Sequence, residues 1–255
     1  EVAFGNLMQK RINKILIICS NYDYYMLEED GRIDERIFDE YTALNLRYPP
    51  SFFHANSAKR AVKILENDKI DLIITWLDIG NTQTFEASKQ IKEAFPKIPI
   101  MALSHYSSLL RRKLEKEKSG IIDLVFHWNG NVDIFLAIIK LTEDRMNAEK
   151  DINEIGVKAI LLVEDSMKYY SRYLPIIYKI IFNQTRSFMS EGLNDYRKMM
   201  LMRGRPKILL AINFEEGKEL FEKYKENLLG VISDVNYFRD GKRDPEAGFH
   251  LLKYV

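Results

Sequence analysis

Short apolar runs recur along this chain and alternate with stretches of helical periodicity. The runs at residues 15–21 and 71–76 match two later runs at 160–166 and 229–234. Between the members of each pair lies a stretch whose apolar residues stand three or four positions apart, as in a helix that packs on a core. Strands that alternate with helices predict a parallel sheet. The sequence therefore predicts two copies of one α/β fold.

The first copy has two further apolar runs, at 99–104 and 121–126, with a helical stretch at 107–118 between them. We number these runs as the fourth and fifth strands of a five-stranded, flavodoxin-like sheet. A long amphipathic helix at 132–153 is expected to close this copy and lead into the second one. Pairing of that helix in a coiled-coil dimer is the alternative. We expect the first domain to cover residues 1–153.

The second copy is expected over residues 154–255, with an insertion near 183–205, and it reaches only its third strand. An open sheet that lacks two strands exposes apolar surface and backbone donors. We therefore expect a chain that is part of a longer protein, or a sheet that another copy completes or another element covers. The predicted fold class is α/β: two flavodoxin-like domains with parallel five-stranded sheets flanked by helices, the second truncated after its third strand.

Carboxylates follow two strands of the second copy. Glu164 and Asp165 come directly after the run at 160–163, and Asp234 ends the run at 229–234. The carboxyl ends of neighbouring parallel strands meet at one edge of a sheet, so these three side chains can converge there on a cation. Such an arrangement is the outline of a phosphoryl-transfer site.

Composition excludes several other classes of function. Lysine and arginine number 38 and aspartate and glutamate 37, so no basic excess marks a nucleic-acid binder. No apolar run approaches the roughly 18 residues that a membrane span needs. The single cysteine, Cys19, cannot form an internal disulfide. We expect a cytoplasmic protein that binds neither nucleic acid nor membrane.

Taken together, these residues resemble the receiver domain of two-component response regulators. The resemblance implies that Asp165 and Asp234 bind Mg²⁺ directly, that Glu164 binds it through water, and that the backbone carbonyl of Asn236 supplies a further oxygen. It also implies that Asp234 is the phosphoacceptor, whose carboxylate takes a phosphoryl group from a histidine kinase or phosphotransfer protein. The hydroxyl and the lysine that receivers carry after their fourth and fifth strands would lie beyond Val255.

The loop after Asp234 departs from the family pattern. Tyr237 and Phe238 stand where Met-Pro is usual, and a charged segment follows at 239–245. We expect this segment to be a solvated turn with Gly241 and Pro245 as breakers. The alternative is a loop that shapes access to Asp234.

The first copy lacks the acidic residues of the family. The positions of the acid pair, the acceptor and the lysine are occupied by Cys19 with Ser20, by Trp76 and by His127. Asp23 and Asp78 are near, but a shift of two residues along an extended chain moves a side chain by roughly 6.6 Å. We predict a degenerate pseudo-receiver that serves as a docking or dimerisation surface, which makes a homodimer possible.

A wider resemblance covers residues 161–249, including the segments 174–178, 186–192 and 203–211. These look like the N-terminal region of bacterial proteins related to phosphoenolpyruvate synthase and pyruvate phosphate dikinase, in which tandem receiver-like modules precede the enzymatic part. We expect a receiver region, not itself an enzyme, whose phosphorylation at Asp234 regulates a C-terminal output domain absent from this chain. The alternatives are a non-phosphorylated interaction scaffold and the N-terminal part of an active phosphotransferase.

Overall fold

The computed structural model describes residues 6–29, 32–44, 46, 48–77, 82–105, 120–189 and 195–255. Contacts divide the chain into two compact units. The first, called here the N-terminal unit, comprises Ile12–Ala43 and Arg47–Ile138. The second, called the C-terminal unit, comprises Glu1–Arg11, Leu44–Leu46 and Ile139–Val255.

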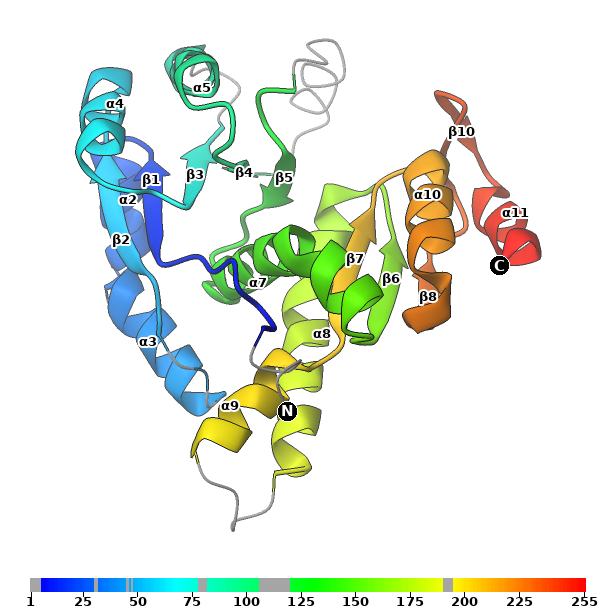
Figure 1. The fold of residues 1–255 in the computed structure, drawn as a ribbon. Helices are drawn as coiled ribbons and strands as arrows, with labels where there is room; N and C mark the ends of the chain where they lie inside the picture. The colour runs from blue at the N-terminus through cyan, green and yellow to red at the C-terminus, as the bar shows by residue number, and fades with distance from the viewer. Residues whose placement is uncertain are drawn as a thin grey trace. The chain divides into compact units, whose positions relative to one another are not determined.

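The N-terminal unit contains a five-stranded sheet, in which every pair of neighbours is parallel. Its strands are β1 (Lys14–Ile18), β2 (Ser51–Ala55), β3 (Leu72–Trp76), β4 (Ile100–Ser104) and β5 (Leu124–His127). They are ordered β2-β1-β3-β4-β5, which is the order of a flavodoxin-like sheet (Figure 1). The predicted α/β class with a five-stranded parallel sheet is confirmed.

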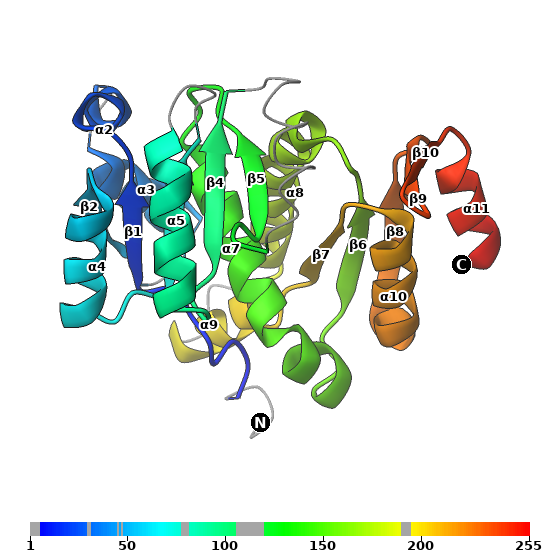
Figure 2. The same ribbon diagram turned by 90° about the horizontal axis from the view of Figure 1, so that it is seen from above.

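Helices cover both faces of this sheet, because its central strands are buried on both sides. They are α2 (Asn21–Glu28), α3 (Ile33–Ala43), α4 (Ala58–Asn67), α5 (Thr82–Ala94) and the first turns of α7 (Asp133–Ala148). Figure 2 shows α4 and α5 in front of the sheet and α3 behind it. Every residue of β3 and β4 is buried, and apolar side chains of α4 and α5 pack on the sheet. The predicted helical stretch at 107–118 lies outside the described residues.

The C-terminal unit contains a smaller parallel sheet. Its strands are β6 (Ala159–Val163), β7 (Lys207–Ala211) and β8 (Leu228–Ser233), in the order β7-β6-β8. The order places the first strand of this copy between its second and third, as in the sheet of the N-terminal unit. On β8, at the edge, the side chains of Leu229 and Ile232 are 59% and 48% exposed.

The remaining elements of this unit are helices and one antiparallel hairpin. The helices are the later turns of α7, the π-helix η1 (Glu149–Glu154), α8 (Met167–Ser187), α9 (Asp195–Arg203), α10 (Phe214–Tyr224), the 3₁₀-helix η2 (Lys225–Asn227) and α11 (Ala247–Tyr254). The hairpin pairs β9 (Tyr237–Arg239) with β10 (Lys242–Asp244). Gly156, at φ +81°, follows the long helix in the left-handed conformation that commonly ends a helix. None of the described helices is both long and apolar enough to cross a membrane.

A buried ionic cluster ties α7 to β7. Asp144 accepts hydrogen bonds from both terminal nitrogens of Arg205, at 3.0 and 2.8 Å, from the Tyr178 hydroxyl and from the backbone N–H of Ile208. Lys207 is also buried, and its Nζ lies 2.9 Å from the Asp151 carboxylate. Burial lowers the pKa of Lys207, and the Asp144 charge opposes that shift. Two acids and two bases thus offset one another inside the C-terminal unit.

Candidate metal centre

The ends of β6 and β8 bring three carboxylates together. Val163, the last residue of β6, pairs with Ser233, the last residue of β8. Glu164 and Asp165 therefore leave the sheet beside Asp234, at the same edge. One carboxylate oxygen from each of the three residues lies within 4.8 Å of the other two. Of the residues that the structure describes, these form the one group of three or more acidic, histidine or cysteine side chains that could share a metal ion.

Backbone contacts hold these strand ends in place. The N–H of Asp234 donates to the carbonyl of Val163 at 2.9 Å, which continues the β6–β8 ladder by one residue. The N–H of Gly248, at the start of α11, donates to the carbonyl of Val235 at 3.0 Å. The loop that carries Asp234 and Asn236 is therefore clamped between β6 and α11.

The clustering of negative charge is visible in the ionisation of Glu164. This buried side chain has its pKa raised to about 7, first by burial and then by the charges of Asp234 and Asp165. The backbone N–H of Ser166 donates to Oε1 of Glu164 at 2.9 Å, and this hydrogen bond opposes the rise in pKa. A divalent cation among the three carboxylates would relieve their repulsion, and oxygen ligands of this kind suit Mg²⁺. The donor set therefore fits the predicted ion.

The segment after Asp234 supplies an arginine that sequence analysis did not find. The charged segment 239–245, expected to be a solvated turn, forms the β9–β10 hairpin instead. Asp240 and Gly241 connect its strands at φ +50° and +71°, as a two-residue type I′ turn requires. The Asp-Gly pair was the signal for this hairpin. Its result is that Arg243 faces Asp165 and Asn236.

Arg243 contacts two of the predicted ligands. Its Nη1 lies 3.2 Å from Oδ2 of Asp165, and its Nη2 donates to the backbone carbonyl of Asn236 at 3.2 Å. Its Nε donates to the side-chain oxygen of Asn236 at 3.0 Å. The guanidinium thus bridges an acid after β6 and a carbonyl after β8.

The corresponding positions of the N-terminal unit carry no acidic cluster in the described part of the chain. Trp76 is buried and meets Trp128 edge to face, with ring centroids 5.4 Å apart. Asp23 interacts with Ser20 instead, where the two exchange hydrogen bonds at the start of α2. Asp78 lies outside the described residues. At the position of Asp234, this sheet thus has a buried tryptophan packed on a second one.

Cys19 is expected to be chemically inert in the folded protein. Burial, followed by the charge of Asp23, raises the pKa of its thiol to about 12, so the reactive thiolate is scarce at neutral pH. We expect iodoacetamide at pH 8 to leave the native chain unmodified and to alkylate it in urea, as measured by intact mass. Because Cys19 is the single cysteine, the urea sample is its own control. Alkylation at equal rates would contradict this expectation.

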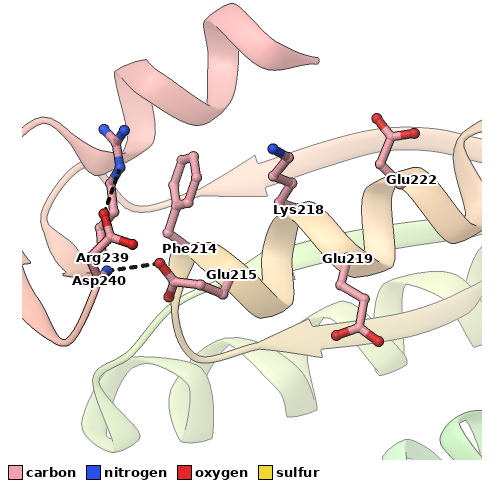
Figure 3. A pocket seen from close by; sticks show the side chains of 7 residues that line it. All are labelled: Phe214, Glu215, Lys218, Glu219, Glu222, Arg239 and Asp240. Atoms are coloured by element: carbon pink, nitrogen blue, oxygen red, sulfur yellow. Dashed lines mark hydrogen bonds and ion pairs between the residues drawn. The ribbon is translucent and has the colours of Figure 1, made fainter.

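A shallow groove lies on the outer side of α10 (Figure 3). It is lined by Phe214, Glu215, Lys218, Glu219, Glu222, Arg239 and Asp240. The backbone N–H of Asp240 donates to Oε1 of Glu215 at 2.8 Å, and the Arg239 guanidinium lies 4.8 Å from the Phe214 ring centroid. None of the three clustered acids lines this groove. Its contacts join the β9–β10 hairpin to the first turn of α10.

The raised pKa of Glu164 predicts a pH-dependent stability. Unfolded, this carboxyl ionises near its ordinary pKa of 4.5, whereas in the fold it ionises near 7. Between these two pKa values the folded state therefore binds more protons than the unfolded state. The free energy of unfolding falls as the pH rises through this range. Between pH 5 and 8 the wild type should lose about 2 to 3 kcal/mol of unfolding free energy through this group. Glu164→Gln should not show this loss. Urea unfolding in EDTA measures it.

The control for this experiment is Glu219→Gln, an exposed glutamate on α10. Its stability should follow that of the wild type at both pH values. Equal pH dependence in the wild type and in Glu164→Gln would show that Glu164 is not titrating in this range.

Comparison with solved structures finds several chains of similar fold. No family model and no curated protein matches the sequence. A signal receiver domain of an HD domain-containing protein from Pseudomonas fluorescens Pf-5 is 16% identical over 56% of this chain and 94% of its own, with a TM-score of 0.36. A response regulator protein from Burkholderia pseudomallei, solved with a phosphorylated aspartic acid, calcium ion and citrate, is 13% identical over 85% of this chain and 98% of its own, with a TM-score of 0.37. Identities and TM-scores this low carry no information about function.

Proposed function

We propose that the C-terminal unit is a receiver domain of a two-component signalling system, which binds Mg²⁺ and is phosphorylated on Asp234. The observation that carries the proposal is the meeting of Glu164, Asp165 and Asp234 at the ends of two parallel strands, with their oxygens within 4.8 Å of one another. In this proposal Asp165, Asp234 and the carbonyl of Asn236 bind the ion directly, and Glu164 binds it through water. The ion, when bound, would neutralise the charge that develops on the transferred phosphoryl group.

The chain's own contribution is a positioned nucleophile. A carboxylate oxygen of Asp234 forms the new P–O bond while the P–N bond of a phosphohistidine donor breaks, and the donor nitrogen keeps the electron pair. The clamp on the Asp234 loop by Val163 and Gly248 limits its movement during this transfer. The donor would be a histidine kinase or a phosphotransfer protein.

The rest of the proposal concerns what the phosphorylation controls. The N-terminal unit, with no acidic cluster among its described residues, would act as a docking or dimerisation surface. The state of Asp234 would be passed to a C-terminal output domain, of the kind found in proteins related to phosphoenolpyruvate synthase and pyruvate phosphate dikinase. A scaffold that is never phosphorylated is the second candidate, favoured by the Arg243 guanidinium that already pairs with Asp165.

Beryllofluoride, a mimic of an aspartyl phosphate, tests the proposal. We expect the wild type to bind it with Mg²⁺, as shown by protein-bound fluoride signals in ¹⁹F NMR and by a higher melting temperature, and Asp234→Asn to lose both. Asp240→Asn is the matched control, because Asp240 is 86% exposed at its side chain and its φ of +50° also suits asparagine. Absence of binding by folded wild-type protein would leave the scaffold.

A further inference from the structure

Arg243 occupies ligands that a metal ion would need. Two of its nitrogens lie 3.2 Å from Oδ2 of Asp165 and from the carbonyl oxygen of Asn236. These belong to two of the three residues proposed above as direct ligands of Mg²⁺. The positive charge of the guanidinium therefore already lies beside the Asp165 and Asn236 oxygens.

The hairpin places this arginine, because several contacts fix it to α10. Figure 3 shows Asp240 and Arg239, at its turn end, beside the first turn of that helix. The N–H of Asp240 donates to Glu215 at 2.8 Å, and Arg239 lies over Phe214 and within 3.5 Å of an Asp244 oxygen. Arg243 stands opposite Phe238 in the hairpin register. The backbone of Arg243 is thus held while its side chain reaches back toward the cluster.

The side chain of Arg243 is nevertheless able to leave. It is 46% exposed, whereas that of its partner Asp165 is 4% exposed. Magnesium requires oxygens at about 2.1 Å in near-octahedral geometry. An ion held by Asp165 and Asn236 would lie only a few ångströms from the guanidinium, and the two cations repel each other. Solvent gives the Arg243 guanidinium an alternative that the buried Asp165 carboxylate lacks.

We propose that Arg243 is an internal counter-cation that competes with the divalent ion for Asp165 and Asn236, so that binding of the ion displaces the guanidinium from the site. This inference rests on the proposed function, because it takes the acidic cluster to be a metal site. It assigns to the hairpin a regulatory role: Arg243 sets the concentration of metal at which the site fills. The apo protein keeps the cluster partly neutralised without any ion.

Metal affinity tests the inference directly. Mg²⁺ binding is measured by calorimetry, and Mn²⁺ binding by the loss of the free-ion electron paramagnetic resonance signal, for wild type, Arg243→Gln and Lys242→Gln. Displacement breaks the pairing of the guanidinium with Asp165. Coulomb's law for two unit charges about 4 Å apart in a water-like dielectric therefore predicts about fivefold tighter binding by Arg243→Gln, which has no such pair to break. Lys242→Gln removes an equal charge from the neighbouring, exposed position on β10 and should bind as the wild type does.

The outcomes separate this inference from the proposed function. Tighter binding by Arg243→Gln alone supports competition, including the case in which only that variant binds. Equal or weaker binding by Arg243→Gln, with a wild type that binds, overturns the competition and leaves the metal site intact. No binding by any of the three proteins overturns the metal site itself, and with it both proposals.

A second measurement follows the Arg243 side chain in the wild-type protein. In the wild type, the Nε–H of Arg243 donates to Asn236 at 3.0 Å. If Mg²⁺ displaces the guanidinium, this proton should exchange with water faster in saturating Mg²⁺ than in EDTA, as followed by ¹⁵N-edited NMR. The resonance is assigned by its absence from Arg243→Gln. Unchanged or slower exchange at saturation would overturn the displacement.

Discussion

Replacement of Gly248 by alanine is expected to destabilise the C-terminal unit and to weaken the proposed Mg²⁺ binding. A Cβ at this position would lie 2.2 Å from the carbonyl oxygen of Asp234 and 2.9 Å from Cα of Val235. Both neighbours are backbone atoms, so no side-chain rotation relieves the clash. Either α11 or the loop that carries Asp234 must move. Overpacking of this kind costs about 3 kcal/mol, and the displaced loop takes Asp234 and Asn236 out of position.

Urea unfolding and Mg²⁺ calorimetry measure the two effects of Gly248→Ala. The matched control is Gly230→Ala on β8, where a Cβ would have open space around it and the backbone is not in the left-handed region. That variant should keep wild-type stability and affinity. A folded Gly248→Ala with wild-type affinity would show that the contact between α11 and the Asp234 loop does not position the site.

Asparagine at position 144 is expected to cause the largest loss of stability outside the site. Asp144 is fully buried and offsets the charge of Arg205, whose side chain is 2% exposed, while it also accepts from Tyr178 and Ile208. The substitution leaves the buried Arg205 without its paired carboxylate, and Lys207 with Asp151. Removal of one partner from a buried ion pair costs about 3 to 5 kcal/mol. Hydrogen exchange of the β6 and β7 amides measures the loss.

The control for Asp144→Asn is Glu149→Gln, which removes an exposed carboxylate paired with Lys223 in the same unit. Ion pairs on the surface contribute little to stability. The β6 and β7 amides should therefore keep their wild-type protection from exchange in Glu149→Gln. Equal losses in the two variants would contradict the importance of burial. A small loss in Asp144→Asn alone would mean that the cluster tolerates a net charge.

Local patterns in the sequence were sufficient to predict most strands of the sheets, although β2 (Ser51–Ala55) was not located in advance. The apolar runs at 15–21, 71–76 and 160–166 became β1, β3 and β6 because a strand buried on both faces must be apolar throughout its length. The same reasoning placed Glu164, Asp165 and Asp234 at one edge, since parallel strands end on the same side. These properties depend on residues close together in the chain, or on the general geometry of parallel sheets.

Arg243 and the buried ionic cluster could not be found in this way. Arg243 is 78 residues from Asp165, and Arg205 is 61 residues from Asp144. The Asp240-Gly241 turn indicates a hairpin, but which acid its arginine meets depends on how the hairpin lies against α10. Lys207 likewise is the first residue of an apolar strand, yet it is fully buried and its Nζ lies beside Asp151.

The sequence by itself therefore determined the class of fold, most strands of the two sheets and the edge on which the acids gather. The tertiary structure alone decided which cation stands beside those acids, and which charges are buried together in the C-terminal unit. The physical reason is that hydrophobic periodicity reports the burial of a face, which repeats every few residues. An ion pair depends on the meeting of two single side chains, and no period in the sequence records it.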